Sequence, residues 1–226
     1  MNIVGLDLGK ANDYSAISIL GIVPTKYKTC VPGIDPELNV RRDREITVEG
    51  LPLMNHVRYV ERLPIGTSYP RVVARVIDVL RSLPAGAWLV ADNSGVGQAV
   101  TDLIIQAGLC PICVTITGGN NVSHDETGRY FNVPKRDLVE VLRVAFQSKR
   151  IKINSRIPDV KILVSELQNF KIKINLKTAH DSYEAWREGD HDDLVLSVGL
   201  AAWAAHYYYS HRETREVYVM KDDYQI

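Results

Sequence analysis

Acidic side chains stand where predicted buried elements begin or end. Asp7 lies near the end of an apolar strand, Asp92 directly follows the apolar run 87–91, and the stretch Asp190–Asp193 comes just before a long apolar helix. Ionised carboxylates at such close spacing repel one another unless something cationic holds them together. A helix N-terminus, a basic neighbour or a metal ion would each do so.

The settings of these acids favour the metal ion. The ends of neighbouring strands in an open α/β sheet meet at one crevice, where ligands bind, and a helix N-terminus beside it favours a further carboxylate. Carboxylate oxygens suit hard divalent cations, Mg²⁺ above all. Two such ions can activate a water and stabilise the leaving oxygen in phosphodiester cleavage. The pattern therefore predicts a site for divalent metal ions.

Each acid also has a purely structural interpretation. Asp7 can cap the turn at Gly9, and Asp13 suits a turn as well. Asp92 can be a helix N-cap and form a turn with the residues that follow it, and Asp192 can be a helix N-cap, a role that Asp fills well. The hypothesis of a metal site draws its strength from these settings occurring together in one chain.

The elements that must position the acids follow from hydrophobic periodicity. Strands are predicted at 3–8, 14–23, 57–63, 87–91 and 112–117, with short alternating ones at 150–153 and 171–174. Helices are predicted at 69–83, 97–107, 134–146, 158–170 and 192–210. A loop or an irregular excursion is predicted at 29–50, and a loop at 118–132. Three strands followed by strand–helix alternation indicate an α/β fold with a mixed sheet. Because no repeat or linker interrupts it, we expect one domain over 1–226, with a peripheral tail at 211–226.

Composition indicates an ordinary globular protein. Of 226 residues, 46% are hydrophobic and 24% charged, and the net charge is zero, so global charge neither supports nor excludes a nucleic-acid partner. Three cysteines cannot all pair within the chain, and Cys110 and Cys113 lack the second pair that a zinc site needs. No run approaches the roughly 20 apolar residues of a membrane span. We expect a cytoplasmic protein, in the host cytoplasm if it is encoded by a phage or prophage.

Four stretches carry a resemblance to a known family: GLDLGKANDYSAI, VADNSGVGQAV, VPKRDLVEVLRVAFQSKRIKI and AWREGDHDDLVLSVGLAAW. In this order they resemble the nuclease domain of phage terminase large subunits, of the RNase H-like (RuvC-like) superfamily, over most of the chain. The resemblance implies a five-stranded mixed sheet of order 3-2-1-4-5 flanked by helices, and cleavage of double-stranded DNA with two Mg²⁺ or Mn²⁺ ions. By motif, Asp7, Asp92 and Asp193 would form the catalytic, metal-binding triad, with Asp192 and Asp13 as auxiliary ligands. Asp193 is favoured over Asp192 as the direct ligand.

The resemblance also implies partners. They are double-stranded DNA, a packaging ATPase domain or chain, the small terminase and the portal. Terminase large subunits carry an ATPase ahead of the nuclease, yet no G-x-x-x-x-G-K-[ST] motif occurs in this sequence. An excised domain, a split gene product and a free-standing nuclease all fit that departure.

Positive charge gathers in one part of the chain. Between Lys135 and Lys177 there are eleven Lys or Arg and four Asp or Glu, a balance of +7. If the two short strands pair, an added two-stranded element would present a basic strip suited to phosphates rather than bases. The candidate DNA contacts are Lys135, Arg136, Lys149, Arg150, Lys152, Lys171 and Lys173. No major-groove recognition helix is evident, so little sequence specificity is expected; a merely solvated basic surface is the alternative.

Other functions fit parts of the pattern. GLDLG also opens actin-like and sugar-kinase ATPases, but these need two lobes and a second phosphate loop, which this sequence lacks. A Holliday-junction resolvase of the same fold would act as a dimer on four-way junctions. A non-catalytic DNA-binding or docking module of a packaging complex is a third alternative, against which the full acidic set argues.

Overall fold

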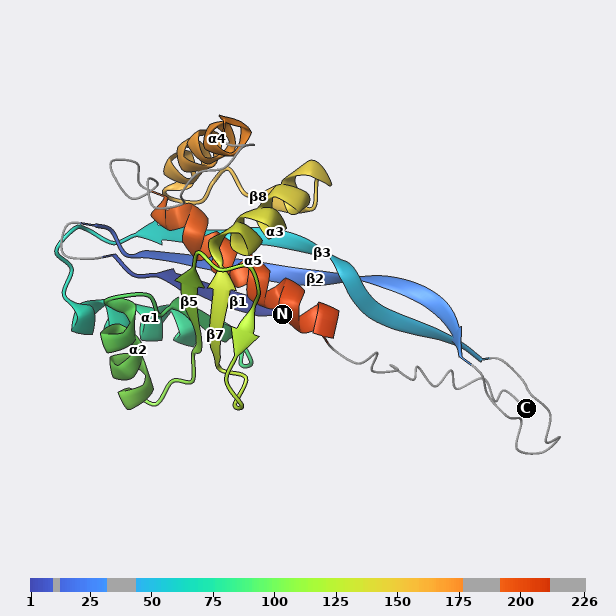
Figure 1. Ribbon diagram of the computed structural model, residues 1–226, viewed down its shortest axis with the longest axis horizontal. Helices are drawn as coiled ribbons and strands as arrows, with labels where there is room; N and C mark the ends of the chain where they lie inside the picture. The colour runs from blue at the N-terminus through green and yellow to red at the C-terminus, as the bar shows by residue number, and fades with distance from the viewer. Residues whose placement is uncertain (10–12, 32–43, 177–191, 212–226) are drawn as a thin grey trace.

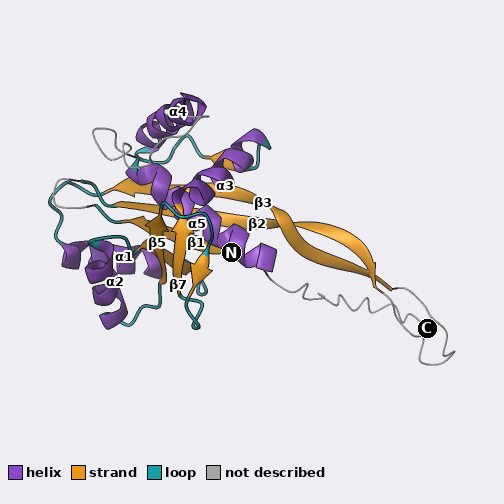
Figure 2. Ribbon diagram, in the orientation of Figure 1, coloured by secondary structure: helices purple, strands orange, loops and turns teal. Residues whose placement is uncertain are grey.

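One mixed sheet runs through the protein and carries helices on both faces (Figures 1 and 2). The computed structural model describes residues 1–9, 13–31, 44–176 and 192–211. Its strands are β1 (Asn2–Asp7), β2 (Ala16–Val31), β3 (Arg44–Arg62), β4 (Trp88–Asp92), β5 (Ile112–Thr117), β6 (Ser123–His124), β7 (Tyr130–Pro134) and β8 (Ile151–Ile153). Its helices are α1 (Tyr69–Arg81), α2 (Gly97–Gln106), α3 (Lys135–Gln147), α4 (Val160–Leu176) and α5 (Asp193–His211).

The order of the strands places several strand ends together. The sheet runs β6-β7-β5-β4-β1-β2-β3-β8 and contains the expected order 3-2-1-4-5 at its centre. The predicted α/β class with a mixed sheet flanked by helices is therefore confirmed, whereas the sheet has eight strands in the described residues and not five. β4, β5 and β7 follow β1 in a parallel series, and β3 runs the same way because β2 is antiparallel to both β1 and β3. We call the edge where β1, β4 and β7 end, at Asp7, Asp92 and Pro134, the carboxylate edge.

The two faces of the sheet have separate hydrophobic cores. Ile3 packs in one core with residues of α3, α4 and α5, whereas Val4 and Leu6 pack in the other with residues of α1 and α2. Successive side chains of a strand point to opposite faces. Asp7 therefore shares the face of Ile3, and Asp92 shares the face of Val90, which lies in the same core. Both acids are directed to the side of the sheet that α5 covers.

Helix α5 is the central element of that face. It contacts β1, β2, β3 and β4 as well as α3 and α4, and its residues from Asp193 to Ala205 are almost all buried. A helix that is apolar all round is one buried inside a protein. Within the described part of the chain, no helix combines the length and apolarity needed to cross a membrane.

A glycine lets α5 approach the sheet closely. A Cβ on Gly5 of β1 would stand 1.9 Å from the carbonyl oxygen of Ser197, so any other residue would force the helix away. Ser197 lies one helical turn after Asp193, and Gly5 lies two residues before Asp7. The close approach therefore brings the start of α5 to the end of β1.

Three sequence predictions of secondary structure are wrong. Strands β2 and β3 pair as far as Val31 and Arg44, well into the segment 29–50 that was predicted as a loop or an irregular excursion, and their hairpin extends away from the body of the protein (Figure 1). Its polarity is compatible with strands because these arms leave the core. The segment 118–132, also predicted as a loop, contains β6 and the start of β7. The predicted tail lies outside the described residues except for His211.

The predicted strand at 171–174 belongs instead to α4, so the basic two-stranded element does not exist. β8, the other predicted half, pairs in parallel with β3. Four alternating residues are too few to distinguish a strand from a helical turn, and extending an existing helix needs no new nucleus. The charges of Lys171 and Lys173 therefore lie on a helix, and their side chains fall outside the description.

Candidate functional site

The first two acids stand side by side on neighbouring strands. In the parallel pairing of β1 with β4, Leu6 is level with Ala91, so Asp7 and Asp92 follow at the same level. Neighbouring strands are about 4.8 Å apart. Both side chains are buried, with 6% of Asp7 and 8% of Asp92 exposed. The carboxylate edge therefore presents two adjacent buried acids toward α5.

The turn after β4 fixes Asp92. Its Oδ1 accepts a hydrogen bond from the backbone N–H of Ser94 at 2.8 Å, and the Ser94 hydroxyl accepts one from the backbone N–H of Ile116 on β5 at 2.8 Å. The N-cap position of α2 is occupied by Val96, so Asp92 does not cap this helix, whereas its interpretation as a turn residue is confirmed. Asp92 instead orders the turn that it begins.

The pair at the start of α5 divides into a buried and a partly exposed acid. The backbone carbonyl of Asp192 accepts a hydrogen bond from Leu196 N–H at 2.8 Å, which places Asp192 at the head of the helix. Its Oδ2 lies 3.4 Å from Nζ of Lys135, the first residue of α3. Asp193 is the buried member, with 3% of it exposed.

Burial and mutual repulsion act on these acids together. Burial raises the pKa of Asp7 well above its ordinary value, and the charges of Asp92, Asp193, Asp192 and Asp13 raise it further. Burial, followed by the charge of Asp13, also raises the pKa of Asp193 to about 8. Five carboxyl groups thus share one electrostatic field. Asp13 is held in its loop by the N–H of Tyr14, which donates to its Oδ1 at 3.0 Å.

The donor set fits a hard divalent cation in its chemistry. All five groups offer carboxylate oxygens, the ligands that Mg²⁺ and Mn²⁺ accept. A bound cation would offset both the burial and the repulsion that raise the pKa values of Asp7 and Asp193. Among the residues that the structure describes, no group of three or more His, Cys, Asp or Glu side chains is close enough to hold an ion. Coordination by the whole triad therefore requires these side chains to draw together around the ion.

Two residues that the sequence analysis did not single out also meet at this edge. Arg62, at the end of β3, pairs with Glu166 of α4, and its Nη2 lies 3.4 Å from Oδ2 of Asp193. Burial raises the pKa of Glu166 to about 7. A local signal for Glu166 existed: it stands three residues after Leu163 and one before Leu167, which places a charge on the apolar stripe of α4.

The predicted DNA contacts do not form one cluster. Lys135 lies at the site, against Asp192, whereas Arg136 is about half exposed and donates to the side chain and backbone oxygens of Asn120. The strand pairings locate β8 relative to β1. Ile151, the first residue of β8, pairs with Asn55 of β3, and Asn55 pairs with Ile22 of β2. The N–H of Ile22 in turn donates to the carbonyl of Met1, so β8 begins level with the start of β1. Asp7 is six residues further along β1, roughly 20 Å at about 3.3 Å per residue.

Lys149, Arg150 and Lys152 therefore lie near the opposite end of β1 from the acids. Lys149 and Lys152 are exposed, and Ile151 and Ile153 pack against the core, so the alternation predicted for this short strand is confirmed. The carbonyl of Arg150 accepts the backbone N–H of Asn55 at 2.8 Å, which ties this segment to β3. These three cations are therefore separated from the carboxylate edge by about the length of β1.

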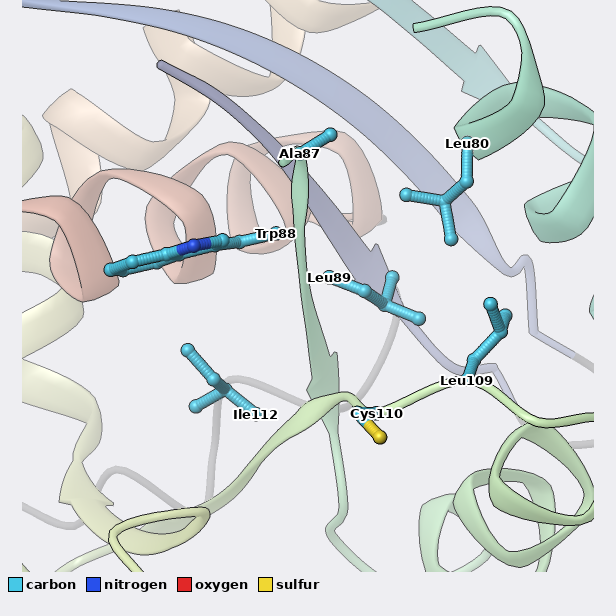
Figure 3. A pocket seen from close by; sticks show the side chains of 7 residues that line it. All are labelled: Leu80, Ala87, Trp88, Leu89, Leu109, Cys110 and Ile112. Atoms are coloured by element: carbon cyan, nitrogen blue, oxygen red, sulfur yellow. The ribbon is translucent and has the colours of Figure 1, made fainter. Parts of the chain in front are cut away.

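An apolar pocket of about 340 Å³ lies at the far edge of the sheet (Figure 3). Its lining comes from the starts of β4 and β5, the end of α1 and the segment before β5: Leu80, Ala87, Trp88, Leu89, Leu109, Cys110 and Ile112. This lining contains no carboxylate and no Lys or Arg. The pocket is thus separate from the acids and unsuited to phosphate.

Several solved structures are similar to this chain, whereas no protein family and no curated protein matches it. Two of these structures are of the human cytomegalovirus terminase nuclease domain soaked with manganese, and the second also has an inhibitor bound. The first has 12% identity and a TM-score of 0.46, covering 94% of this chain and 87% of that one. The second has the same identity and TM-score, covering 92% and 85%. The case for a function therefore rests on the residues of the site.

Proposed function

We propose that this protein is a metal-dependent endonuclease that hydrolyses double-stranded DNA with little sequence specificity. The observation that carries the proposal is the burial of Asp7, Asp92 and Asp193 at one edge of the sheet, within one electrostatic field. Buried like charges are costly unless a cation joins them. Strongly perturbed carboxyl groups at the ends of parallel strands are typical of functional sites.

Asp7, Asp92 and Asp193 would hold two Mg²⁺ or Mn²⁺ ions, with Asp192 and Asp13 as auxiliary ligands. Bound ions supply the Lewis acidity that makes a water nucleophilic and stabilises the leaving oxygen of a phosphodiester. The chain itself orients the ligands: the Ser94 N–H holds one oxygen of Asp92, and the first turn of α5 carries Asp193. Asp192 keeps Lys135 at the site, where its ammonium can bind a DNA phosphate.

The DNA would cross the carboxylate edge and extend toward β8. Lys135 and Arg136 lie at the N-terminus of α3, where the helix macrodipole disfavours cations and favours anions. A phosphate at this position would be attracted both by the two side-chain charges and by the helix N-terminus. Lys149, Arg150 and Lys152 would bind phosphates farther along the duplex, and Lys171 and Lys173 of α4 would add to them. Contacts of this kind position DNA and carry no sequence information.

Genome packaging is the process that the resemblance of the four sequence stretches suggests. In that setting the nuclease would cut the DNA that a packaging ATPase moves, and its partners would be that ATPase, as a domain or a separate chain, the small terminase and the portal. Nothing in the proposed chemistry requires these partners for cleavage of naked DNA.

The test is cleavage of a supercoiled plasmid with Mg²⁺, Mn²⁺, Ca²⁺ or EDTA, by wild type and Asp7→Asn. The matched control is Asp78→Asn, which removes an exposed acid from α1 on the other face of the sheet. We expect nicking and linearisation with Mg²⁺ or Mn²⁺ in wild type and control, and none in EDTA or in Asp7→Asn. Cleavage that persists in EDTA or in Asp7→Asn would overturn the proposal. Strong preference for a four-way junction over a linear duplex would indicate a resolvase instead.

A further inference from the structure

Arg62 is a mostly buried cation that lies between two acids, Glu166 and Asp193. Its guanidinium pairs with Glu166 of α4 and also lies 3.4 Å, Nη2 to Oδ2, from Asp193, which we assign to the metal. The Arg62 side chain is only 13% exposed. At this position the guanidinium can compete with a metal ion for Asp193.

Contacts from several elements determine where Arg62 can reach. Its backbone N–H donates to Oδ2 of Asp159 at 3.2 Å, and its Cζ lies 4.5 Å from the centre of the Tyr14 ring. These contacts hold the residue and one face of its guanidinium. The orientation of the guanidinium N–H groups is therefore determined by its two carboxylate partners, Glu166 and Asp193.

Glu166 is fixed more firmly than a surface partner would be. One of its oxygens, Oε1, pairs with Arg62, and the other, Oε2, accepts a hydrogen bond from the backbone N–H of Val195 at 3.0 Å. Val195 belongs to the first turn of α5, two residues after Asp193, and Glu166 is 5% exposed. Glu166 therefore binds Arg62 while it is itself hydrogen-bonded to α5, the helix that carries Asp193.

We propose that Glu166 is a positioning residue that holds Arg62 back from Asp193 and so leaves Asp193 available to the metal ion. The proposal rests on the metal site of the proposed function. An Arg without its partner closes onto a nearby carboxylate, because charge-assisted bonds in a buried site are strong and an uncompensated buried charge is costly. With Glu166 in place, the shorter contact of Arg62 is to Glu166 and the longer one is to Asp193.

This arrangement gives variants of the two partners opposite effects on metal affinity. Glu166→Gln frees Arg62 to pair with Asp193, so Mn²⁺ binding should weaken about 10-fold, the lower end of the range for residues that support metal ligands. Arg62→Gln removes the competitor, so Mn²⁺ binding should strengthen. The double variant should bind Mn²⁺ as tightly as wild type or more tightly, because without Arg62 no guanidinium is present to pair with Asp193 when Glu166 is lost. An ion pair that only braces the fold would instead weaken binding in both single variants.

The experiment is a calorimetric titration of the full chain with Mn²⁺, with denaturant unfolding of each variant to establish that it is folded. Glu140→Gln and Arg143→Gln are the matched controls, because they break an exposed ion pair on α3 and should leave Mn²⁺ affinity unchanged. Absence of Mn²⁺ binding in wild type would refute the proposed function itself.

Binding in wild type that weakens equally in both single variants would refute the positioning role and leave the nuclease proposal standing. If Glu166→Gln does not fold, Arg62→Gln decides alone: stronger binding supports the proposal, and unchanged or weaker binding overturns it.

Discussion

Gly5 of β1 lies directly under the carbonyl oxygen of Ser197 in α5, where even a methyl group would be only 1.9 Å from that oxygen. The backbone of the helix is thereby packed onto the backbone of the strand. Asp7 lies two residues after Gly5, and Asp193 lies one helical turn before Ser197. The contact between Gly5 and Ser197 therefore sets how closely the two acids approach each other.

Gly5→Ala should therefore damage both stability and the site. Overpacking of a well-packed core costs about 1–3 kcal/mol and occasionally more, and moving α5 outward separates Asp193 from Asp7. Denaturant unfolding measures the first effect and Mn²⁺ titration the second. Gly118→Ala is the control, since no atom lies within 4 Å of the added Cβ. Wild-type stability in Gly5→Ala would show that α5 does not depend on this contact.

Asp92→Asn should separate activity from stability. The amide oxygen can still accept the Ser94 N–H, so the turn should persist. We expect cleavage to fall by more than about 100-fold, the upper end for residues that only support a metal ligand. Metal-free stability should be unchanged or higher, because one of the charges that repel Asp7 is gone. Plasmid cleavage and thermal unfolding in EDTA test the two halves, and an Asp92→Asn variant that cleaves like wild type would remove Asp92 from the triad.

The metal-free protein should lose stability as the pH rises. The pKa of Asp193 is raised to about 8 from an ordinary 3.8, and that of Glu166 to about 7 from 4.5. Between the ordinary and the raised pKa values, the folded protein keeps protons that the unfolded chain has released. The contribution of these two groups to stability is therefore fully present below about pH 4 and is lost as the pH rises to about 8. In EDTA the unfolding temperature should fall from pH 5 to pH 8.

Metal should reverse that trend, because its binding requires ionised carboxylates and releases their protons. The stabilisation by Mn²⁺ should therefore be larger at pH 8 than at pH 5, and cleavage should fall on acidification. Scanning calorimetry at both pH values, with and without Mn²⁺, measures this difference. Equal stabilisation at the two pH values would mean that the perturbed carboxyl groups do not bind the ion.

Removal of a cation far from the acids should weaken DNA binding without impairing the chemistry. Lys152→Ala takes one exposed charge from β8, and each cation withdrawn from a phosphate lowers the slope of the salt dependence of binding by about one unit. Arg81→Ala takes an exposed charge from α1, on the other face, as the control. Fluorescence anisotropy across a salt series gives the slopes, and single-turnover cleavage at saturating protein gives the chemical step. The same slope in Lys152→Ala and wild type would place the DNA elsewhere.

Local sequence was sufficient for the parts of the fold that depend on local periodicity. Ile3, Asp7 and the run before Asp92 identified two strands that end in acids, and the rule that parallel strands end at one edge brought those acids together. The strand order 3-2-1-4-5 followed from the resemblance of whole motifs. Asp192 and Asp193 were recognised as the head of a helix because a long apolar run follows them.

Relations between distant residues were beyond reach. The pairing of Arg62 with Glu166 joins positions that are 104 residues apart, and depends on the register of a hairpin whose outer arms look polar. The helix over 171–174 was missed because lysine–isoleucine alternation has the period of a strand, whereas its actual conformation was decided by the helix that precedes it. The sequence around Gly5 does not indicate its role, because that role depends on the carbonyl of Ser197, which packs against it from a distant part of the chain.

The position of α5 in the chain has a consequence for the order of events during synthesis. Every strand of the sheet leaves the ribosome before the helix that covers one of its faces, and that same helix brings the third acid. Non-local contacts of this kind form late, and an uncovered apolar face is open to aggregation in the meantime. A nascent chain from which α5 has not yet emerged therefore lacks Asp193, and the proposed site is incomplete in it. Completion of the fold and acquisition of the third acid are one and the same step.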